Sequence, residues 1–235
     1  MIALVDCRAS TACISAIREH NFEPILIPPA RCLQTGVSSH ADMLLFIGFG
    51  RLFCHARYYE ENKQLIDRIA DLASLELTLS KEAWSADYPH DVLFNACLVG
   101  KSLICNKKTV SKLILDAAEE HNFNVINVPQ GYTKCSVCVV SDNAVITSDN
   151  AIAKACTDAN VKVLTVCEGH ISLPPYEFGF IGGASGLCGD KVYFCGSLNS
   201  HPDALSIIDF CRAYGKDTVS LGNHGLLDIG TMFFI

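Results

Sequence analysis

A stretch near the start of the chain returns in its middle. Residues 19–28 read Glu-His-Asn-Phe-Glu-Pro-Ile-Leu-Ile-Pro, and residues 120–129 read Glu-His-Asn-Phe-Asn-Val-Ile-Asn-Val-Pro. Each copy has the end of an amphipathic helix, an asparagine that tolerates the left-handed conformation of a helix cap, and then a strand. A match that spans two elements without a gap predicts a chain built from repeated units.

The clearest unit is residues 134–166, with two apolar strands joined by a turn at Asp142-Asn143, then a short helix and a third strand. Similar units are predicted at 41–79, 91–128 and 179–221. The two ends are incomplete, because residues 1–28 lack one hairpin strand and residues 227–235 form a lone strand. Joined together they make a fifth unit. We therefore predict one α/β domain, 1–235, a ring of five strand–strand–helix–strand units in which strand 227–235 pairs with strand 2–6.

Composition excludes several classes of protein. Half of the residues are hydrophobic and the net charge is −7, which favours a large core and argues against a nucleic-acid partner. No apolar run reaches the ~20 residues that span a bilayer, and the chain starts directly with a strand, so we expect no membrane partner and no signal peptide. Because no signal peptide is expected and the count of 13 cysteines is odd, we predict reduced thiols and a cytoplasmic location.

The only Cys-x-x-Cys pair is Cys135 and Cys138. It lies in a predicted strand, where positions three apart face opposite sides of the sheet. No second pair accompanies it. We therefore expect no metal site and no cofactor.

Five such units around a pseudo-five-fold axis resemble the pentein fold, the fold of the guanidino-group-modifying enzymes. That superfamily includes arginine deiminase, dimethylarginine dimethylaminohydrolase and the amidinotransferases. The segments that look most like a compact bacterial branch of it are Lys134-Cys135-Ser136, Ile146-Thr147-Ser148-Asp149, the glycine-rich residues 180–186, and residues 196–202.

The resemblance implies a cysteine nucleophile near the final strand, a histidine, and carboxylates that hold the guanidinium group. The corresponding segment here is Gly225-Leu226-Leu227-Asp228-Ile229-Gly230, and Ile229 stands where that cysteine would be. Isoleucine cannot act as a nucleophile. We therefore expect neither standard deiminase nor amidinotransferase activity, and whether the chain is an enzyme stays open.

The first strand of each unit should begin near the central axis. The residues expected there, and therefore the candidate ligand-binding residues, are Asp42, Asp91, Lys134, Cys135, Phe180 and Asp228. Aspartates in this position can bind a cation or a guanidinium group through charge-assisted hydrogen bonds, but they can equally cap turns or pair with Arg8 and Lys134. Cys135 beside Lys134 is the candidate for a relocated nucleophile with a lowered pKa, and the alternative is an ordinary buried thiol. His170 is the candidate general base, or else a surface histidine.

Three hypotheses for function follow. The first is a binder of a small amino-acid or guanidino ligand at the axis. The second is a non-catalytic interaction module, since a ribosomal-subunit anti-association factor has a similar five-fold ring. The third is a metal- or thiol-dependent divergent hydrolase that uses Cys135 and His170. A polar axis with converging Asp, Lys and Cys favours the first hypothesis over the second, and an apolar plug favours the reverse. The sequence leaves the oligomeric state open.

Overall fold

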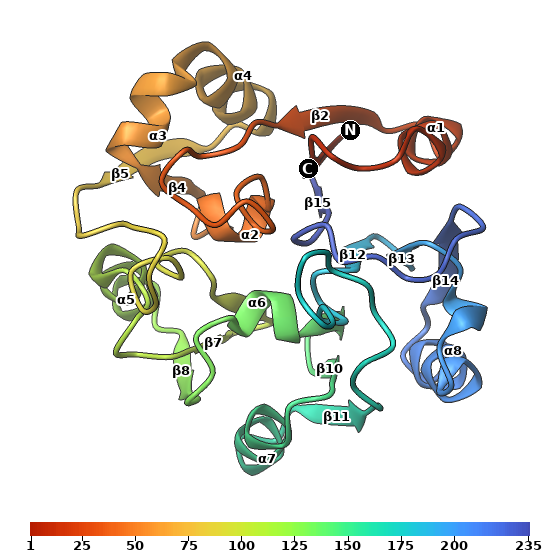
Figure 1. Ribbon diagram of the computed structural model, residues 1–235. Helices are drawn as coiled ribbons and strands as arrows, with labels where there is room; N and C mark the ends of the chain where they lie inside the picture. Colours follow the sequence, from red (N-terminus) through yellow and green to blue (C-terminus); the bar gives the residue numbers. More distant parts are fainter.

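The same chain path is repeated in five three-stranded sheets that together form a ring (Figure 1). In a complete unit the first two strands form an antiparallel hairpin, and a helical crossover then leads to a third strand that runs parallel to the second. The computed structural model, which describes residues 1–235, therefore confirms the predicted pentein-like ring of five units.

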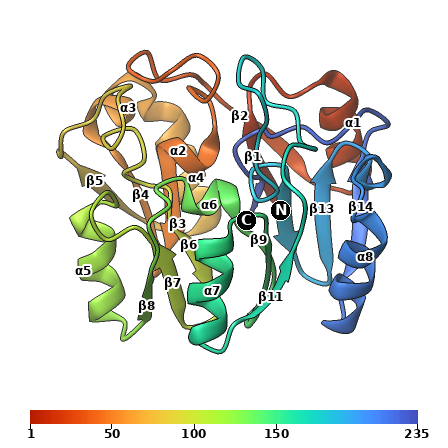
Figure 2. The ribbon, with the colours of Figure 1, turned by 60° about the horizontal axis from the view of Figure 1, so that its bottom comes forward.

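The crossover helices of the five units lie on the outside of the ring in both ribbon views (Figures 1 and 2). Four units are contiguous in the chain. The first two consist of β3 (Leu45–Gly48), β4 (Arg51–His55), α3 (Ala56–Glu61), α4 (Lys63–Ala73) and β5 (Glu76–Ser80), and of β6 (Cys97–Val99), β7 (Ser102–Cys105), α5 (Lys112–Glu120) and β8 (Asn124–Asn127). The other two consist of β9 (Cys138–Ser141), β10 (Ala144–Thr147), α7 (Asn150–Asp158) and β11 (Lys162–Thr165), and of β12 (Ser185–Cys188), β13 (Lys191–Cys195), the 3-10 turn η1 (Leu198–Ser200), α8 (Ala204–Ala213) and β14 (Asp217–Leu221).

The fifth unit joins the two ends of the chain. It consists of β15 (Phe233–Phe234), β1 (Ile2–Asp6), α1 (Thr11–Glu19) and β2 (Glu23–Ile27). β15 pairs antiparallel with β1, with Phe234 opposite Ala3, and β1 pairs parallel with β2. The predicted pairing of the C-terminal strand with strand 2–6 is present, although the strand is much shorter than the predicted 227–235.

The repeat found in the sequence is a repeat of backbone conformation. Helices α1 and α5 both end at a histidine, His20 and His121. The asparagine after each histidine has a positive φ, 64° at Asn21 and 55° at Asn122. Asparagine adopts this left-handed conformation more readily than most residues, so the sequence itself ends each helix and directs the chain back into a strand.

The predicted starts of the first strands are wrong by several residues. Asp42 lies in a one-turn helix, α2 (Ala41–Leu44), and Cys135 lies in another, α6 (Thr133–Ser136). Residues 91–96 and 180–184 are also outside the strands. Periodicity could not separate these turns from the strands that follow, because both are buried among apolar residues and a short buried run has no polar face. A turn thus stands before each first strand at the centre of the ring.

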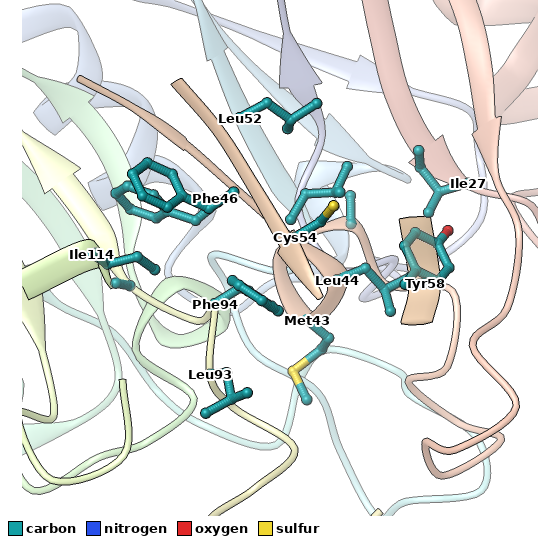
Figure 3. Close-up of a cluster of buried hydrophobic side chains, with 14 of the residues drawn as sticks. Ile27, Met43, Leu44, Phe46, Leu52, Cys54, Tyr58, Leu93, Phe94 and Ile114 are labelled. Carbon is teal, nitrogen blue, oxygen red and sulfur yellow. The ribbon is translucent and has the colours of Figure 1, made fainter. Parts of the chain in front are cut away.

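The hydrophobic core is divided among the contacts between neighbouring units. The largest cluster has 32 buried residues and joins the units of β1, β4 and β7; ten of its side chains are labelled in Figure 3, among them Leu44, Phe94 and Ile114. Three smaller clusters of 15, 11 and 10 buried residues fill the other contacts. All thirteen cysteines are free. None of the helices combines the length and apolar character needed to cross a membrane.

Candidate functional site

The turns at the centre of the ring bring several buried polar side chains together. In Figure 1, α2 and α6 lie near this centre. Seven polar or thiol side chains from these turns and from the end of β1 are each at most 3% exposed: Asp6, His40, Asp42, Asn95, Cys135, Asp228 and Thr231. We call these residues the axial cluster.

His40 lies between two carboxylates of the axial cluster. Its Nε2 is 3.7 Å from Asp6 Oδ2, and its Nδ1 is 3.7 Å from Asp228 Oδ1. Both distances exceed the length of a hydrogen bond, and neither ring nitrogen has a hydrogen-bond partner. A buried imidazole with two free nitrogens is unusual, because buried polar groups are almost always paired.

Asp42 and Cys135 are in direct contact. The Cys135 thiol donates a hydrogen bond to Asp42 Oδ2 at 3.2 Å, and Asn95 Nδ2 donates to Cys135 Sγ at 3.1 Å. Asp42 Oδ1 has no partner. One potential ligand atom from each of His40, Asp42 and Cys135 lies within 4.8 Å of the others. This is the closest gathering of nitrogen, oxygen and sulfur donors in the interior.

Thr231 holds the axial cluster together at the cost of backbone strain. Its φ is +64°, which is rare for a β-branched residue. Its hydroxyl donates to Asp42 Oδ2 at 2.8 Å and contacts the Gly182 carbonyl at 3.0 Å, and its N–H donates to the Gly183 carbonyl at 2.9 Å. Strained residues that persist in this way concentrate at functional sites.

Asp6 is tied to Arg8 at the rim of the axial cluster. Arg8 Nη2 is 2.6 Å from Asp6 Oδ2, and Ser39 Oγ donates to Asp6 Oδ1 at 2.7 Å. Burial alone would raise the pKa of Asp6, but the hydrogen bonds from Arg8 and Ser39 lower it overall. Asp6 therefore stays ionised, and the Arg8 side chain, which is 40% exposed, connects the axial cluster to the surface.

A pocket of about 210 Å³ opens beside the axial cluster. It is lined by Asp6, Arg8, Gly36, Leu173, Pro174, Leu227, Asp228 and Ile229. Asp6 and Asp228, which flank His40, are thus also among the residues that line this pocket. Ile229, which stands where the resemblance would place a nucleophilic cysteine, contributes an apolar wall. We call this the rim pocket.

Asp228 is held by the backbone of a glycine-rich turn. Its Oδ2 accepts from the Phe180 N–H at 2.9 Å, and its Oδ1 accepts from the Gly230 N–H at 2.9 Å. A Cβ on Gly183 would lie 2.0 Å from Asp228 Oδ1, so only glycine allows this approach. Burial raises the pKa of Asp228. Phe180, predicted as a ligand-binding residue, contributes here through its backbone.

Lys134 does not activate Cys135, and the predicted lowering of the thiol pKa is wrong. Burial first, and then the charges of Asp42 and Asp228, raise the pKa of Cys135 well above its ordinary value. Lys134 Nζ instead lies 3.2 Å from Thr231 Oγ1. It lines a second pocket of about 180 Å³, together with Thr231 and Phe233.

Asp91 and His170 lie outside the axial cluster. Asp91 Oδ2 accepts a hydrogen bond from the Tyr132 hydroxyl at 2.6 Å, and the Tyr132 ring stacks with that of Phe180 at a centroid distance of 6.4 Å. His170 is exposed, and its ring meets that of His201 at 5.5 Å. The structure therefore does not bring His170 together with Cys135.

The histidine near Cys135 is His40, which sequence reasoning missed. Asn95 and Thr231 were missed as well. A usable signal existed, because the polar run Ser38-Ser39-His40, followed by Asp42, comes directly before the apolar residues 43–47. Of the predicted residues, Asp42, Cys135 and Asp228 belong to the axial cluster. Lys134 touches it through Thr231.

Comparisons with known proteins identify the fold but no activity. The model of a family of unknown function, DUF6873, matches residues 4–233. No curated protein matches the sequence. The fold is similar to that of a dimethylarginine dimethylaminohydrolase from Pseudomonas aeruginosa, a C249S mutant in complex with citrulline (TM-score 0.58, 8% identity, 94% of this chain and 91% of that one).

Two further solved structures share the fold. One is the N-terminal domain of ArgZ, a cyanobacterial arginine dihydrolase, as a C264S mutant bound to its substrate (TM-score 0.57, 10% identity, 92% of this chain and 80% of that one). The other is SxtG, an amidinotransferase from Microseira wollei (TM-score 0.52, 8% identity, 89% of this chain and 72% of that one). At these identities the likeness shows the fold alone.

Proposed function

The chain belongs to the DUF6873 family, and we propose that its rim pocket binds a small cationic ligand of the amino-acid or guanidino class. The observation that carries the proposal is the pairing of two buried carboxylates, Asp6 and Asp228, on the wall of one pocket. A guanidinium or ammonium group bound in this pocket, beside both residues, would form charge-assisted hydrogen bonds, which are the stronger kind.

The other walls of the rim pocket fit a ligand with two ends. Arg8 stands at the exposed side, where a guanidinium group can hold the carboxylate of an amino acid. Leu173, Leu227 and Ile229 provide an apolar surface between the charged groups. The volume of about 210 Å³ is below that of sites for drug-sized ligands, which favours a ligand the size of a single amino acid.

The polar axial cluster also discriminates between the sequence hypotheses. A non-catalytic interaction module has no need of buried carboxylates and an unpaired histidine in its centre, since each costs free energy. The similar structures in complex with citrulline or with a substrate support the same ligand class by fold alone. We therefore rank the interaction module below the small-molecule binder.

Calorimetric titration and thermal unfolding with arginine, citrulline, agmatine and lysine test the proposal, with a chelator present throughout. A ligand held at 100 times its dissociation constant should stabilise the protein by about 2.7 kcal/mol. Asp228→Asn should abolish the effect, whereas Asp209→Asn, which changes an exposed carboxylate paired with Arg212, should retain it. Binding that survives Asp228→Asn, or the absence of binding by every cationic ligand, contradicts the proposal.

A second candidate function is thiol chemistry at Cys135. The sequence paired this residue with His170, but the proximity of Cys135 to His40 and Asp42 favours His40 as its proton acceptor. The raised pKa of Cys135 argues for a resting thiol that needs a ligand or a cation to ionise. We expect no citrulline from arginine or dimethylarginine. A colorimetric citrulline assay checks this, and product formation that Cys135→Ser abolishes would instead establish the thiol chemistry.

A further inference from the structure

We propose that His40, Asp42 and Cys135 form a binding site for one divalent transition-metal ion of the zinc type. From the sequence, the Cys135 and Cys138 pair predicted no metal site, and the metal- or thiol-dependent alternative paired Cys135 with His170. The proposal does not depend on whether an organic ligand occupies the rim pocket. It rests on the donor atoms, on their missing partners, and on the residues that surround them.

The three side chains offer the right donor atoms at nearly the right separations. Imidazole nitrogen, carboxylate oxygen and thiolate sulfur are the ligands that zinc takes in proteins. Bond lengths of about 2.0–2.3 Å place the ligands of a tetrahedral ion about 3.3–3.8 Å apart. Cys135 Sγ and Asp42 Oδ2 are 3.2 Å apart, and no pair of the three ligand atoms exceeds 4.8 Å. A shift of about 1 Å at one side chain therefore completes the site.

The missing hydrogen bonds are an independent sign that something binds here. Both ring nitrogens of His40 and Oδ1 of Asp42 are buried without a partner, although their residues are at most 1% exposed. Leaving such groups unpaired costs free energy that a folded protein normally avoids. A cation coordinated by one His40 nitrogen and by Asp42 satisfies both residues at once.

The neighbours of the three residues match the surroundings of known metal sites. A histidine that binds a metal usually faces a carboxylate with its other nitrogen, and His40 faces Asp6 on one side and Asp228 on the other, each at 3.7 Å. Asn95 donates to Cys135 Sγ at 3.1 Å, and Thr231 donates to Asp42 Oδ2 at 2.8 Å. Cys135 and Asp42 are thus each already oriented by a hydrogen bond from a second residue, and His40 has a carboxylate on either side.

Charge and proton balance allow the binding step. In the metal-free protein the Cys135 thiol donates to Asp42. Metal binding forms a bond between the ion and the sulfur, breaks the S–H bond and releases one proton to solvent. The thiolate and the Asp42 carboxylate then balance the two positive charges of the ion. Three protein ligands leave one coordination position open, as in catalytic zinc sites. Asp6 and Asp228, which flank His40, also line the rim pocket.

Cobalt(II) titration of the reduced, chelator-stripped protein tests the site directly, because cobalt bound to a thiolate absorbs in the near ultraviolet. We expect one equivalent to bind, zinc to displace it, and Cys135→Ser to remove the absorption. Cys167→Ser, which changes an exposed cysteine, should leave the absorption unchanged. Asn95→Ala should weaken binding about 10- to 100-fold, as expected for a positioning residue next to a ligand.

X-ray absorption on the zinc-loaded wild-type protein gives an answer even where a variant fails to fold. We expect one sulfur at about 2.3 Å together with nitrogen or oxygen ligands at about 2.0–2.1 Å. No zinc at one equivalent, a shell without sulfur, a shell with several sulfurs, or absorption lost in Cys167→Ser would each overturn the proposal. These titrations contain no organic ligand, whereas those for the rim pocket contain a chelator, so the two proposals fail separately.

Discussion

The same backbone conformation occurs at the outside of the ring and at its centre, with opposite chemistry. At the outside, Asn21, Asn122 and Asn160 end their helices with φ of 64°, 55° and 64°, and asparagine is suited to this conformation. At the centre, Thr231 has φ of +64° although a β-branched residue strongly disfavours it. The repeated asparagines therefore stabilise the fold. The axis instead contains a strained residue, Thr231, that is not part of the repeat.

Two buried histidines show the same difference. His55, at the start of α3, accepts the Arg57 N–H at Nδ1 and faces the Glu82 carbonyl at 3.1 Å with Nε2. Its ring also stacks on Trp84 at 4.7 Å. His40 at the axis has no hydrogen bond at either nitrogen. Both ring nitrogens of His55 are therefore paired, whereas both ring nitrogens of His40 are available to bind a ligand.

The largest expected effect comes from the apolar contacts between units. Phe53 is 1% exposed in the largest hydrophobic cluster, so Phe53→Ala should lower the free energy of unfolding by about 3–5 kcal/mol. Asp42→Asn, which keeps an acceptor for Thr231, should change it by less than about 1 kcal/mol, because buried charges contribute little net stability. Urea unfolding of both variants measures this. Equal losses would show that the axis is structural.

A smaller loss is expected where glycine lets the backbone approach Asp228. Gly183→Ala places a methyl group where Asp228 Oδ1 now lies, so the free energy of unfolding should fall by about 1–3 kcal/mol, and ligand binding in the rim pocket should be lost. Gly225→Ala is the control, because its new Cβ would meet nothing closer than 3.8 Å. If both variants bind ligand normally, Asp228 has no part in the site.

The fold could be predicted from the sequence, but the site could be predicted only in part. The Glu-His-Asn-Phe repeat and the incomplete ends are local signals, and they were enough to place the units and to close the ring. Asp42, Cys135 and Asp228 could be predicted as axial residues because they stand at the starts of predicted strands. His40 was missed because its role depends on contacts with Asp6 and Asp228, which lie far away in the sequence. No periodicity reports such contacts.

The burial of His55 predicts a pH dependence of stability. Burial lowers the pKa of His55, so the unfolded chain takes up its proton first as the pH falls. The stabilising contribution is therefore complete above the unfolded pKa of about 6.5 and is lost below it. As the pH falls below that value, the wild type should lose unfolding free energy relative to His55→Asn, by at most about 1.4 kcal/mol per pH unit. A pH-independent difference would contradict a buried neutral His55.

The smallest effect tests whether the repeated helix ends are equivalent. Asn21, Asn122 and Asn160 follow α1, α5 and α7 in three separate units. Alanine at each position must adopt the left-handed conformation, which costs about 1 kcal/mol, whereas glycine should cost nothing. Because the three sites share no partners, the alanine losses should be similar and should add within about 0.5 kcal/mol in the triple variant. Denaturant unfolding of the single and triple variants decides this. Unequal losses would mean that tertiary contacts, such as the stacking of His121 on Phe49, determine the helix ends more than the repeated residues do. The outside of the ring would then depend on contacts specific to each unit, as the axis does.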